Sequence, residues 1–420
     1  MKTVIRNGHL VDPAQGIDGK GDVLIEDGKI SAVGQLGDVD ATPFDAAGQI
    51  VAPGFFDLHV HLREPGAEES ETIRTGGEAA VAGGFTAIAA MPNTRPPIDS
   101  AATAQFVVAE ARRNSPAHVF PIGAVTKGQK GETLAEIGEM VEAGIVGISD
   151  DGKPVMDARL FRRAMEYSRL FDLPVIQHCE DLALSGKGVM HEGPTSTRLG
   201  LEGIPAAAED TMVARDLILT GLTSAKYHVA HLSTRAAVAM VREAKARGLR
   251  VTAEVTPHHF TLTDAAVGEY DTNAKMKPPL RSDEDVKALI EGLADGTIDA
   301  IATDHAPHHQ NLKMHDFDHA PFGITGLETA VGLALTRLDL PMTRMVEVFS
   351  TNPQKIMRVE PWGLFEGSRA DLTIVDPEKE WNFDVTKSRS LSRNTPFDGW
   401  KMRGQATATI VEGHIVHEAD

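Results

Sequence analysis

The chain has 420 residues, of which 42% are hydrophobic and 24% are charged, as in ordinary globular proteins. Its formal net charge of −19 disfavours nucleic acid and anionic membranes as partners. The single cysteine, Cys179, excludes an intramolecular disulfide and a cysteine-rich zinc site, and no apolar stretch is long enough for a signal peptide or a membrane span. We expect Cys179 to be a small buried thiol and the protein to be cytoplasmic.

The two ends of the chain carry similar sequence patterns. Near the N-terminus, β-branched runs are interrupted by Asn7-Gly8 and Asp27-Gly28, and near the C-terminus a similar run surrounds Glu412-Gly413. Such dipeptides between alternating apolar residues predict hairpin turns, because tight turns need positive φ. We expect residues 1–52 and 366–420 to form one small β-sandwich domain, although two unrelated hairpins would give the same pattern.

Between the ends, in residues 53–365, eight apolar runs alternate with stretches rich in Ala, Glu and Arg. The runs cover residues 54–60, 85–91, 118–124, 145–149, 174–177, 226–230, 250–255 and 299–302. Strands that alternate with helices predict parallel βα units. Eight such units predict an α/β fold with a (β/α)8 TIM-like barrel.

Polar side chains follow most of these runs. They are His59 and His61, Asn93, Asp150 and Asp151, His178, His231, His258 and His259, and Thr303, Asp304 and His305. One histidine after a strand is more often a structural residue than a ligand. In a barrel, however, the C-terminal ends of the strands meet at one face, where active sites lie. Histidines and aspartates at successive strand ends therefore predict a shared site.

The spacing of His59 and His61 favours a metal site. Residues two apart on a strand project from the same face, so both imidazoles can bind one ion, whereas a surface pair is disfavoured by the flanking sequence. Imidazole and carboxylate without thiolate suit Zn²⁺, with Mn²⁺ or Co²⁺ as alternatives. The ligands suffice for two ions, which would make a hydroxide available near neutral pH and polarise the carbonyl group that it attacks.

Two further residues near this cluster have candidate roles. Asp304 can take a proton from such a hydroxide and deliver it to a leaving nitrogen, and its structural alternative is a helix N-cap. Arg63 lies two residues beyond His61 and should point the same way. A guanidinium there can clamp a substrate carboxylate, and its alternative is a surface pair with Glu64.

The motifs DLHVHLREPG, MPNTRPP, SDDGKPV, QHCED, HLST, PHH, KPPLR, ATDHAPH and APFGITGLET follow one another along the chain. In this order they resemble the class I dihydroorotases of the amidohydrolase superfamily. The His-x-His pair with the aspartate of ATDH indicates only the superfamily, whereas HLREPG, MPNT and SDDGKPV narrow it to dihydroorotases. The resemblance extends over nearly the whole chain, including both ends.

The resemblance implies a zinc-dependent cyclic amide hydrolase that reversibly cyclises N-carbamoyl-L-aspartate to (S)-dihydroorotate in de novo pyrimidine (UMP) biosynthesis. It implies two zinc ions per subunit, with His59, His61 and Asp304 on one, His178 and His231 on the second, and Asp151 between them. Asp304 would also be the catalytic general base and acid. The substrate contacts it implies are His61, Arg63, Asn93, His308 and the Phe322-Gly323 backbone. Residues 309–321 would form a mobile loop that excludes water.

Two positions stay open in this resemblance. Lys277 stands where many relatives have an asparagine that touches the substrate, so it would either contact the same carboxylate or point into solvent. The bridging ligand would be Asp151, at the strand end, in preference to Asp150 or a carboxylated Lys153.

Two other functions fit part of the pattern. A dihydropyrimidinase, hydantoinase or allantoinase shares the barrel and the ligands, but it needs no carboxylate clamp such as Arg63. A catalytically silent homologue that serves as a structural partner of aspartate transcarbamoylase would lack metal ligands, whereas every expected ligand position is filled here. The resemblance also suggests a homodimer and leaves association with aspartate transcarbamoylase open.

Overall fold

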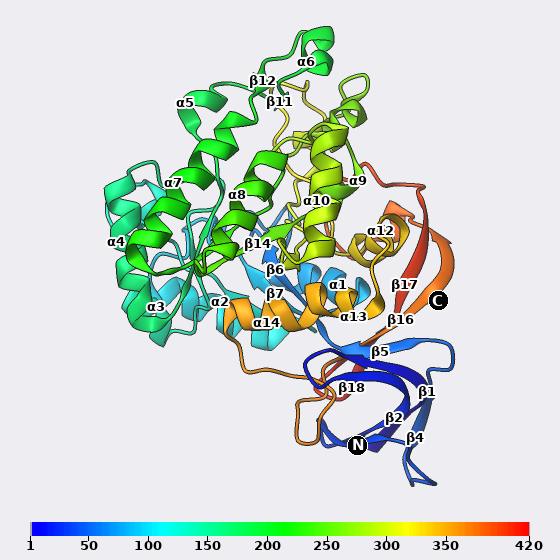
Figure 1. Cartoon of the computed structure of the whole chain (residues 1–420). Helices are drawn as coiled ribbons and strands as arrows, with labels where there is room; N and C mark the ends of the chain where they lie inside the picture. Colours follow the sequence, from blue (N-terminus) through cyan, green and yellow to red (C-terminus); the bar gives the residue numbers. More distant parts are fainter. Residues whose placement is uncertain (1, 420) are drawn as a thin grey trace.

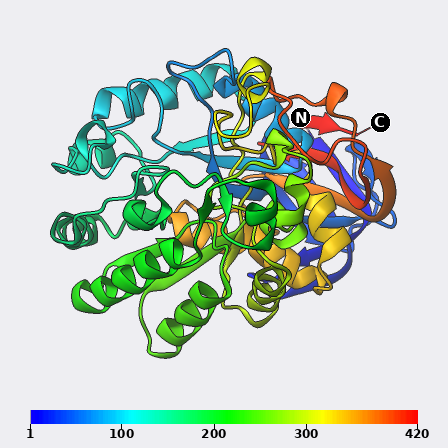
Figure 2. The ribbon, with the colours of Figure 1, turned by 90° about the horizontal axis from the view of Figure 1, so that it is seen from above.

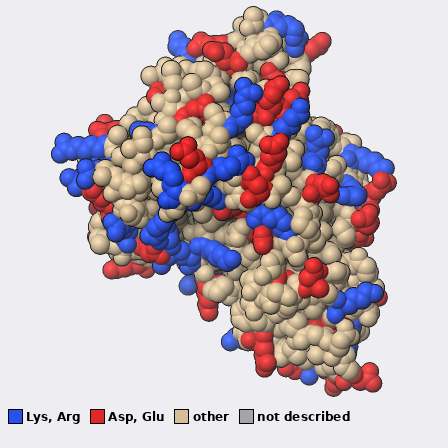
Figure 3. Space-filling view, in the orientation of Figure 1, with Lys and Arg blue, Asp and Glu red and all other residues tan. Residues whose placement is uncertain are grey.

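The computed structural model describes residues 2–419, which form a large body of strands and helices with a smaller β unit at one end (Figure 1). Seen from above, helices lie around the strands of the large body, and the β unit lies to one side (Figure 2). Within residues 2–419, no helix is both long enough and apolar enough to cross a membrane. On the face drawn in Figure 3, acidic and basic side chains lie interspersed.

Strands from both ends of the chain form one hydrogen-bonded sheet. They are β1 (Lys2–Asp12), β2 (Ile17–Glu26), β3 (Lys29–Gly34), β4 (Thr42–Asp45), β5 (Ile50–Pro53), β16 (Leu372–Asn382), β17 (Lys401–Val411) and β18 (His414–Glu418). Their order is β18-β17-β16-β5-β1-β2-β3, with β4 paired to β1. The antiparallel pair of β16 and β5 joins the two ends, and this confirms the shared β unit.

One of the predicted turns in this sheet is wrong. Strand β1 continues through Asn7-Gly8, where its register with β2 shifts between Ile5 and Gly8. Asn7 has a φ of 61°, which fits an extra residue in a β-bulge, and its amide and side chain are held by Asp22 and Asp45. Asn7 therefore adopts its positive φ in a bulge within β1, and not in a hairpin turn. The turns at Asp27-Gly28, between β2 and β3, and at Glu412-Gly413, between β17 and β18, are confirmed.

The large body contains eight parallel strands in two sheets. One sheet holds β6 (Phe55–Val60), β7 (Phe85–Ala90) and β8 (His118–Pro121), and the other holds β9 (Ile148–Ser149), β10 (Pro174–Gln177), β13 (Lys226–Val229), β14 (Val251–Val255) and β15 (Ala300–Ile301). Each strand falls within one of the eight predicted runs. Isolated parallel bridges join Gly123 to Ile148 and Val60 to His305, so the two sheets meet at both of their edges. A further pair, β11 (Met190–His191) and β12 (Gly203–Ile204), lies in the segment after β10.

Helices separate most of these strands, and this confirms the α/β class. They are α1 (Ile73–Ala82), α2 (Ala101–Asn114), α3 (Ile137–Glu142), α4 (Ala158–Ser168), α5 (Leu182–Ser185), α6 (Pro194–Leu199), α7 (Ala207–Thr223), α8 (Arg235–Ala246), α9 (Pro257–Thr261), α10 (Asp283–Asp295), α11 (Gln310–Lys313), α12 (Ala330–Arg337), α13 (Met342–Val346) and α14 (Asn352–Met357). Several begin at a side-chain N-cap, as α8 does at Thr234. Helix α8 buries Ala237, Val241 and Ala244, which are spaced to share one helical face.

Most strands of the large body are buried on both faces, whereas β8 is partly exposed. Phe56 and Leu58 of β6 pack with Ala87 of β7 and Ala300 of β15 in one apolar cluster, and Trp362 lies against Phe56 with ring centroids 5.8 Å apart. A larger apolar cluster fills the space between strands and helices. Strands covered on both faces are nearly continuous apolar runs in sequence, which is why the sequence pattern located them.

Thr373 of β16 ties the terminal sheet to the large body. Its Oγ1 accepts a hydrogen bond from the Phe55 amide at 3.0 Å and donates one to the Gly84 carbonyl at 2.6 Å. Both contacts are buried. Each of these backbone groups depends on Thr373, because an unpaired polar group in a protein interior is costly.

We predict that Thr373→Val lowers the midpoint of urea denaturation, because it keeps the shape of the side chain but leaves both backbone groups unpaired. Each unpaired group should cost about 1–3 kcal/mol. Thr42→Val, at an exposed position of β4, is the matched control and should leave the midpoint unchanged. Equal midpoints for Thr373→Val and the unaltered chain would show that these hydrogen bonds do not hold the two parts together.

Candidate metal centre and active site

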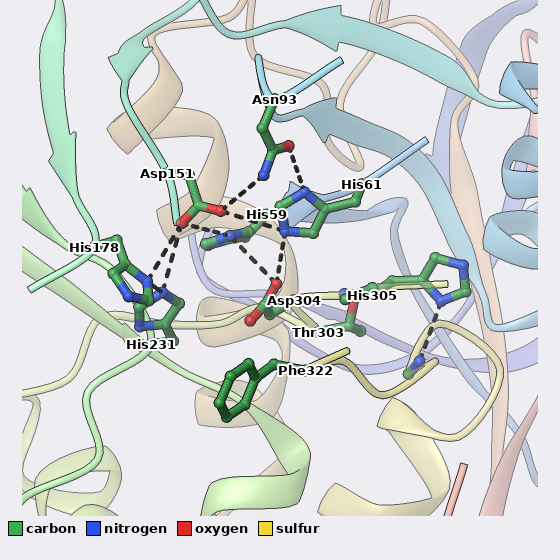
Figure 4. A network of polar contacts seen from close by, with 12 residues as sticks. His59, His61, Asn93, Asp151, His178, His231, Thr303, Asp304, His305 and Phe322 are labelled. Atoms are coloured by element: carbon green, nitrogen blue, oxygen red, sulfur yellow. Dashed lines mark hydrogen bonds and ion pairs between the residues drawn. The ribbon is translucent and has the colours of Figure 1, made fainter. Parts of the chain in front are cut away.

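Six side chains with metal-binding atoms meet at the C-terminal ends of the parallel strands (Figure 4). They are His59 and His61 from β6 and the residue after it, Asp151 after β9, His178 after β10, His231 after β13 and Asp304 after β15. None of them exposes more than 5% of its surface. The structure therefore brings together every residue that the sequence analysis named as a metal ligand.

Asp151 lies at the centre of this cluster. Its Oδ1 is 3.5 Å from His59 Nε2, 3.6 Å from His231 Nε2 and 3.8 Å from His178 Nδ1. Its Oδ2 is 3.4 Å from His61 Nε2. One carboxylate thus faces both histidine pairs, which is the position that a bridging ligand needs.

The other two candidates for the bridging position do not face the cluster. The Asp150 carboxylate accepts hydrogen bonds from the amides of Val125 and Thr126 and from the Thr126 hydroxyl. Lys153 is exposed at the surface. Of the three candidates, only Asp151 reaches the histidines.

The donor set fits divalent cations. His59 Nε2 and Asp151 Oδ1 are buried and have no hydrogen-bond partner in the described part of the chain. Buried polar atoms in native proteins normally have partners, so orphaned ligand atoms that face one another mark a place for a cation. Three overlapping groups of ligand atoms, each within 4.8 Å of one another, surround this place. Imidazole and carboxylate donors without thiolate suit Zn²⁺.

Outer contacts orient three of the histidines. Glu254 of β14 lies 2.6 Å from His59 Nδ1, Asn93 Oδ1 lies 2.7 Å from His61 Nδ1, and Glu180 Oε2 lies 3.0 Å from His178 Nε2. Each contact takes the ring nitrogen that points away from Asp151, and so leaves the nearer nitrogen for a metal. Glu254 and Glu180 were not among the residues predicted from the sequence. The signal for Glu254 was a charged residue inside an apolar strand.

The charges of the cluster stabilise one another. Burial lowers the pKa of His59, but the negative charges of Glu254, Asp304 and Asp151 outweigh burial and hold that pKa well above its ordinary value. Burial raises the pKa of Asp304, but His59 and His61 outweigh it, and the net pKa is lowered. Asp304 is therefore ionised at neutral pH. A metal ion that binds here must displace the proton of His59.

Backbone strain also marks this region. Arg63, His231 and Asp304 all have positive φ, at 61°, 32° and 46°. Such values are uncommon for residues other than glycine, and they cluster at functional sites, where the surrounding structure enforces them.

Arg63 is a cation beside the cluster. Its Nε donates to the Pro307 carbonyl at 3.0 Å, and among residues 2–419 no carboxylate forms an ion pair with it. Burial lowers the pKa of Arg63 to about 10, so the guanidinium stays charged at neutral pH. An ion-paired surface arginine, the alternative with Glu64, is not what the structure contains.

His308 lies next to Arg63 and is neutral. Burial and the charge of Arg63 lower the pKa of His308 to about 2. His308 Nε2 lies 2.8 Å from the Phe322 carbonyl, so this nitrogen carries the proton. The approach of Arg63 Nη2 to the same atom at 3.4 Å is then a packing contact rather than a hydrogen bond.

Lys277 is ion-paired and does not point into bulk solvent. Its Nζ forms an ion pair with Glu180 Oε1 at 2.8 Å and lies 5.1 Å from the centre of the Phe322 ring. The Phe322 ring itself faces the metal-ligand cluster (Figure 4). Gly323 donates its amide to the Lys275 carbonyl, so this amide already has a partner within the chain.

Other conspicuous polar residues stay outside the cluster. His259 is held by Thr256 and the Pro278 carbonyl. Cys179 is buried with its Sγ 3.1 Å from the Tyr227 hydroxyl, and burial holds the pKa of the thiol well above its ordinary value. A protonated, buried thiol is a poor nucleophile.

We predict that Glu254→Gln weakens zinc binding about 10–100-fold, because the charged group that orients His59 is lost. The dissociation constant can be measured by competition with a chromogenic chelator. Asp12→Asn, at an equally buried carboxylate of the terminal sheet, is the control and should bind zinc normally. Unchanged zinc affinity in Glu254→Gln would contradict the orienting role.

Comparisons with known proteins agree with this geometry. The family model described as dihydro-orotase-like matches residues 48–237. A dihydroorotase from Solibacter usitatus is 56% identical over 420 residues, which cover 99% of this chain and 98% of the relative. A dihydroorotase from Geobacter sp. (strain M21) is 53% identical over 424 residues and is matched over 100% of both chains.

Solved structures of related enzymes have the same fold. The L-hydantoinase (dihydropyrimidinase) from Arthrobacter aurescens superposes with a TM-score of 0.89 at 27% identity, over 99% of this chain and 96% of that one. The dihydropyrimidinase from Brevibacillus agri gives a TM-score of 0.87 at 24% identity, over 100% and 95%. The full-length identity to curated dihydroorotases is much higher, and the chain therefore belongs to the dihydroorotase family.

Proposed function

We propose that this chain is a zinc-dependent dihydroorotase that interconverts N-carbamoyl-L-aspartate and (S)-dihydroorotate. The observation that supports this most is Arg63, a charged guanidinium beside the metal-ligand cluster with no ion-paired carboxylate among the described residues. Dihydroorotate carries a carboxylate on its ring, whereas dihydrouracil and allantoin do not. A site built around an unpaired cation favours the charged substrate.

The arrangement of the strands supports a closed (β/α)8 barrel. The bridges from Gly123 to Ile148 and from Val60 to His305 would complete the ring of eight parallel strands. All strand ends would then meet at one face, as in other barrel enzymes. In this division, residues 53–365 form the barrel, and residues 1–52 and 366–420 form the composite β-sandwich domain.

We propose two zinc ions per subunit. His59, His61 and Asp304 would hold one ion and His178 and His231 the other, with Asp151 shared between them; the position of Asp151 between the two histidine pairs supports this assignment. When bound, the ions supply a nucleophile derived from water near neutral pH and polarise the amide carbonyl of the substrate.

Asp304 is proposed as the residue that moves the proton. Its Oδ1 lies 2.9 Å from His61 Nε2, so the carboxylate faces the space where the amide would react. Because its pKa is lowered, the carboxylate is ionised and can accept a proton from the attacking water. In hydrolysis it then delivers this proton to the ring nitrogen, and in cyclisation the transfers run in reverse.

The remaining residues bind and orient the substrate in this proposal. Arg63 would clamp the carboxylate as a two-pronged donor. The Oδ1 of Asn93 contacts His61, and its amide nitrogen lies 3.5 Å from Asp151. The second N–H of that nitrogen would donate to the substrate carboxylate. His308 and the Phe322-Gly323 segment would contact the ring of the substrate. Lys277 would add positive charge at the edge of the site, although it is paired with Glu180 here.

The cellular setting is part of the same proposal. A single buried cysteine suits a reducing cytoplasm. We propose a homodimer, as the resemblance to class I dihydroorotases suggests.

The direct test is turnover by purified protein of known metal content, with dihydroorotate as substrate and dihydrouracil and allantoin as controls. We expect turnover of dihydroorotate alone, lost with a chelator and restored by Zn²⁺. Turnover of a neutral cyclic amide instead would indicate a dihydropyrimidinase or allantoinase. A folded protein without metal or turnover would indicate a silent structural partner.

We predict that Arg63→Ala raises the KM for dihydroorotate roughly 10–100-fold, because hydrogen bonds to a charged group contribute about 1.5–3 kcal/mol. Zinc content should not change. Arg63→Lys keeps the charge but loses the two-pronged donor geometry of the guanidinium, so its KM should lie between those of Arg63→Ala and the unaltered chain. An unchanged KM in Arg63→Ala would remove the carboxylate clamp from the account.

We predict that Asp304→Asn keeps most of its zinc, because the other ligands remain, yet loses turnover about 10²–10⁴-fold, the usual contribution of a general acid or base. Metal analysis and steady-state rates on the same sample separate these effects. Full activity with normal zinc content would exclude Asp304 from proton transfer.

A further inference from the structure

A segment from the C-terminal part of the chain lies beside the proposed active site. This strap, residues 388–395, follows the short 3-10 turn η6 (Val385–Lys387) and precedes β17 of the terminal sheet. Glu71, which also contacts His305, accepts hydrogen bonds from the Ser390 hydroxyl and the Leu391 amide. Ser392 Oγ donates to the Ser70 carbonyl at 2.6 Å. The strap is thus anchored to the loop before α1.

Asn394 of the strap contacts the segments that carry His308 and Gly323. Its side chain is 3% exposed. Its Nδ2 donates to the Ala306 carbonyl at 2.9 Å and to the Gly323 carbonyl at 3.0 Å, while its Oδ1 accepts from the His308 amide at 3.0 Å. One side chain therefore connects two segments that are separate in sequence.

These two segments carry the proposed substrate contacts His308 and Phe322-Gly323. They approach closely, since a side-chain Cβ at Gly323 would lie 2.6 Å from the Ala306 carbonyl oxygen. The Ala306 amide donates to the Ile324 carbonyl at 2.9 Å, and the Asn394 carbonyl accepts from the Thr325 amide at 2.9 Å. Asn394 thus holds this short pair of backbones together.

Only an amide side chain of this length can make all three contacts. The two carbonyls need N–H donors and the His308 amide needs an acceptor, and asparagine offers both in one planar group. An aspartate would turn an acceptor oxygen toward the two carbonyls. An apolar residue would remove the partner of the Ala306 carbonyl and of the His308 amide, whereas the Gly323 carbonyl would keep its hydrogen bond from Lys313 Nζ at 3.1 Å.

We propose that Asn394 is a positioning residue for substrate binding, which fixes His308 and the Phe322-Gly323 backbone in the orientation that the substrate requires. It belongs to the C-terminal part of the chain, so the terminal unit would contribute to the active site. This inference rests on the proposed function, because His308 and Phe322-Gly323 are substrate contacts only in a dihydroorotase.

The test compares Asn394→Ala and Asn394→Asp with the unaltered, zinc-loaded chain. We expect KM for dihydroorotate to rise at least about tenfold in both variants, because the positioned groups lose their brace. The kcat should stay within about threefold and the zinc content should be unchanged, since the contacts of Asn394 do not include the metal-ligand cluster. A purely structural role would instead lower zinc content and kcat together with thermal stability.

Ser392→Ala is the matched control, because it removes another buried hydrogen bond of the strap that does not reach His308 or Gly323. It should leave both KM and kcat near the unaltered values. A tenfold rise of KM in this control would mean that general loosening of the strap, rather than Asn394, sets substrate affinity.

A double-mutant cycle tests whether Asn394 acts through His308. If it does, the double variant raises KM by less than the product of the fold-changes that Asn394→Ala and His308→Ala cause alone. Unchanged KM in folded Asn394 variants, or fully multiplicative effects, would overturn the proposal. If neither variant folds, Asn394→Ser, which keeps a small polar group, takes their place under the same criteria.

The two proposals fail in different ways. If the unaltered chain does not turn over dihydroorotate, the proposed function is wrong and the role of Asn394 falls with it. If the unaltered chain is active and the Asn394 variants keep a normal KM, only the role of Asn394 is rejected.

Discussion

The attraction between buried carboxylates and imidazoles at the strand ends is the interaction on which this structure depends. Asp151 and Asp304 lie almost entirely out of water, where an isolated carboxylate would be very costly. They are tolerated because His59, His61, His178 and His231 surround them. Orphaned ligand atoms remain even so. A divalent cation would satisfy those atoms, and this is why the site is best understood as a metal centre.

Buried carboxylates around the metal-ligand cluster also need partners. Glu254 holds His59 and is itself held by His228, and Glu180 connects His178 to Lys277. These carboxylates are buried, so each depends on the next partner. The strap follows the same rule, because the Ala306 carbonyl and the His308 amide have hydrogen-bond partners in the Asn394 side chain. The C-terminal part of the chain therefore contacts the segments of the site through the strap, whereas Thr373 ties the terminal sheet to the starts of β6 and β7.

The sequence predicted the central strands because these strands are buried on both faces and appear as apolar runs. It predicted the ligand cluster because those runs end in histidine and aspartate. It missed features that depend on three-dimensional partners. Asn7-Gly8 has the sequence of a turn, but paired strands on either side make it a bulge. The partner of Lys277 and the contacts of Asn394 join residues far apart in the chain, and no local pattern identifies them.

The most direct test of the account is a crystal structure of the zinc-loaded protein with bound dihydroorotate, with anomalous scattering recorded at the zinc edge. We expect two zinc peaks with the Asp151 carboxylate between them, and the substrate carboxylate on Arg63. A single zinc ion, a bridge formed by a modified Lys153, or a substrate carboxylate remote from Arg63 would contradict it.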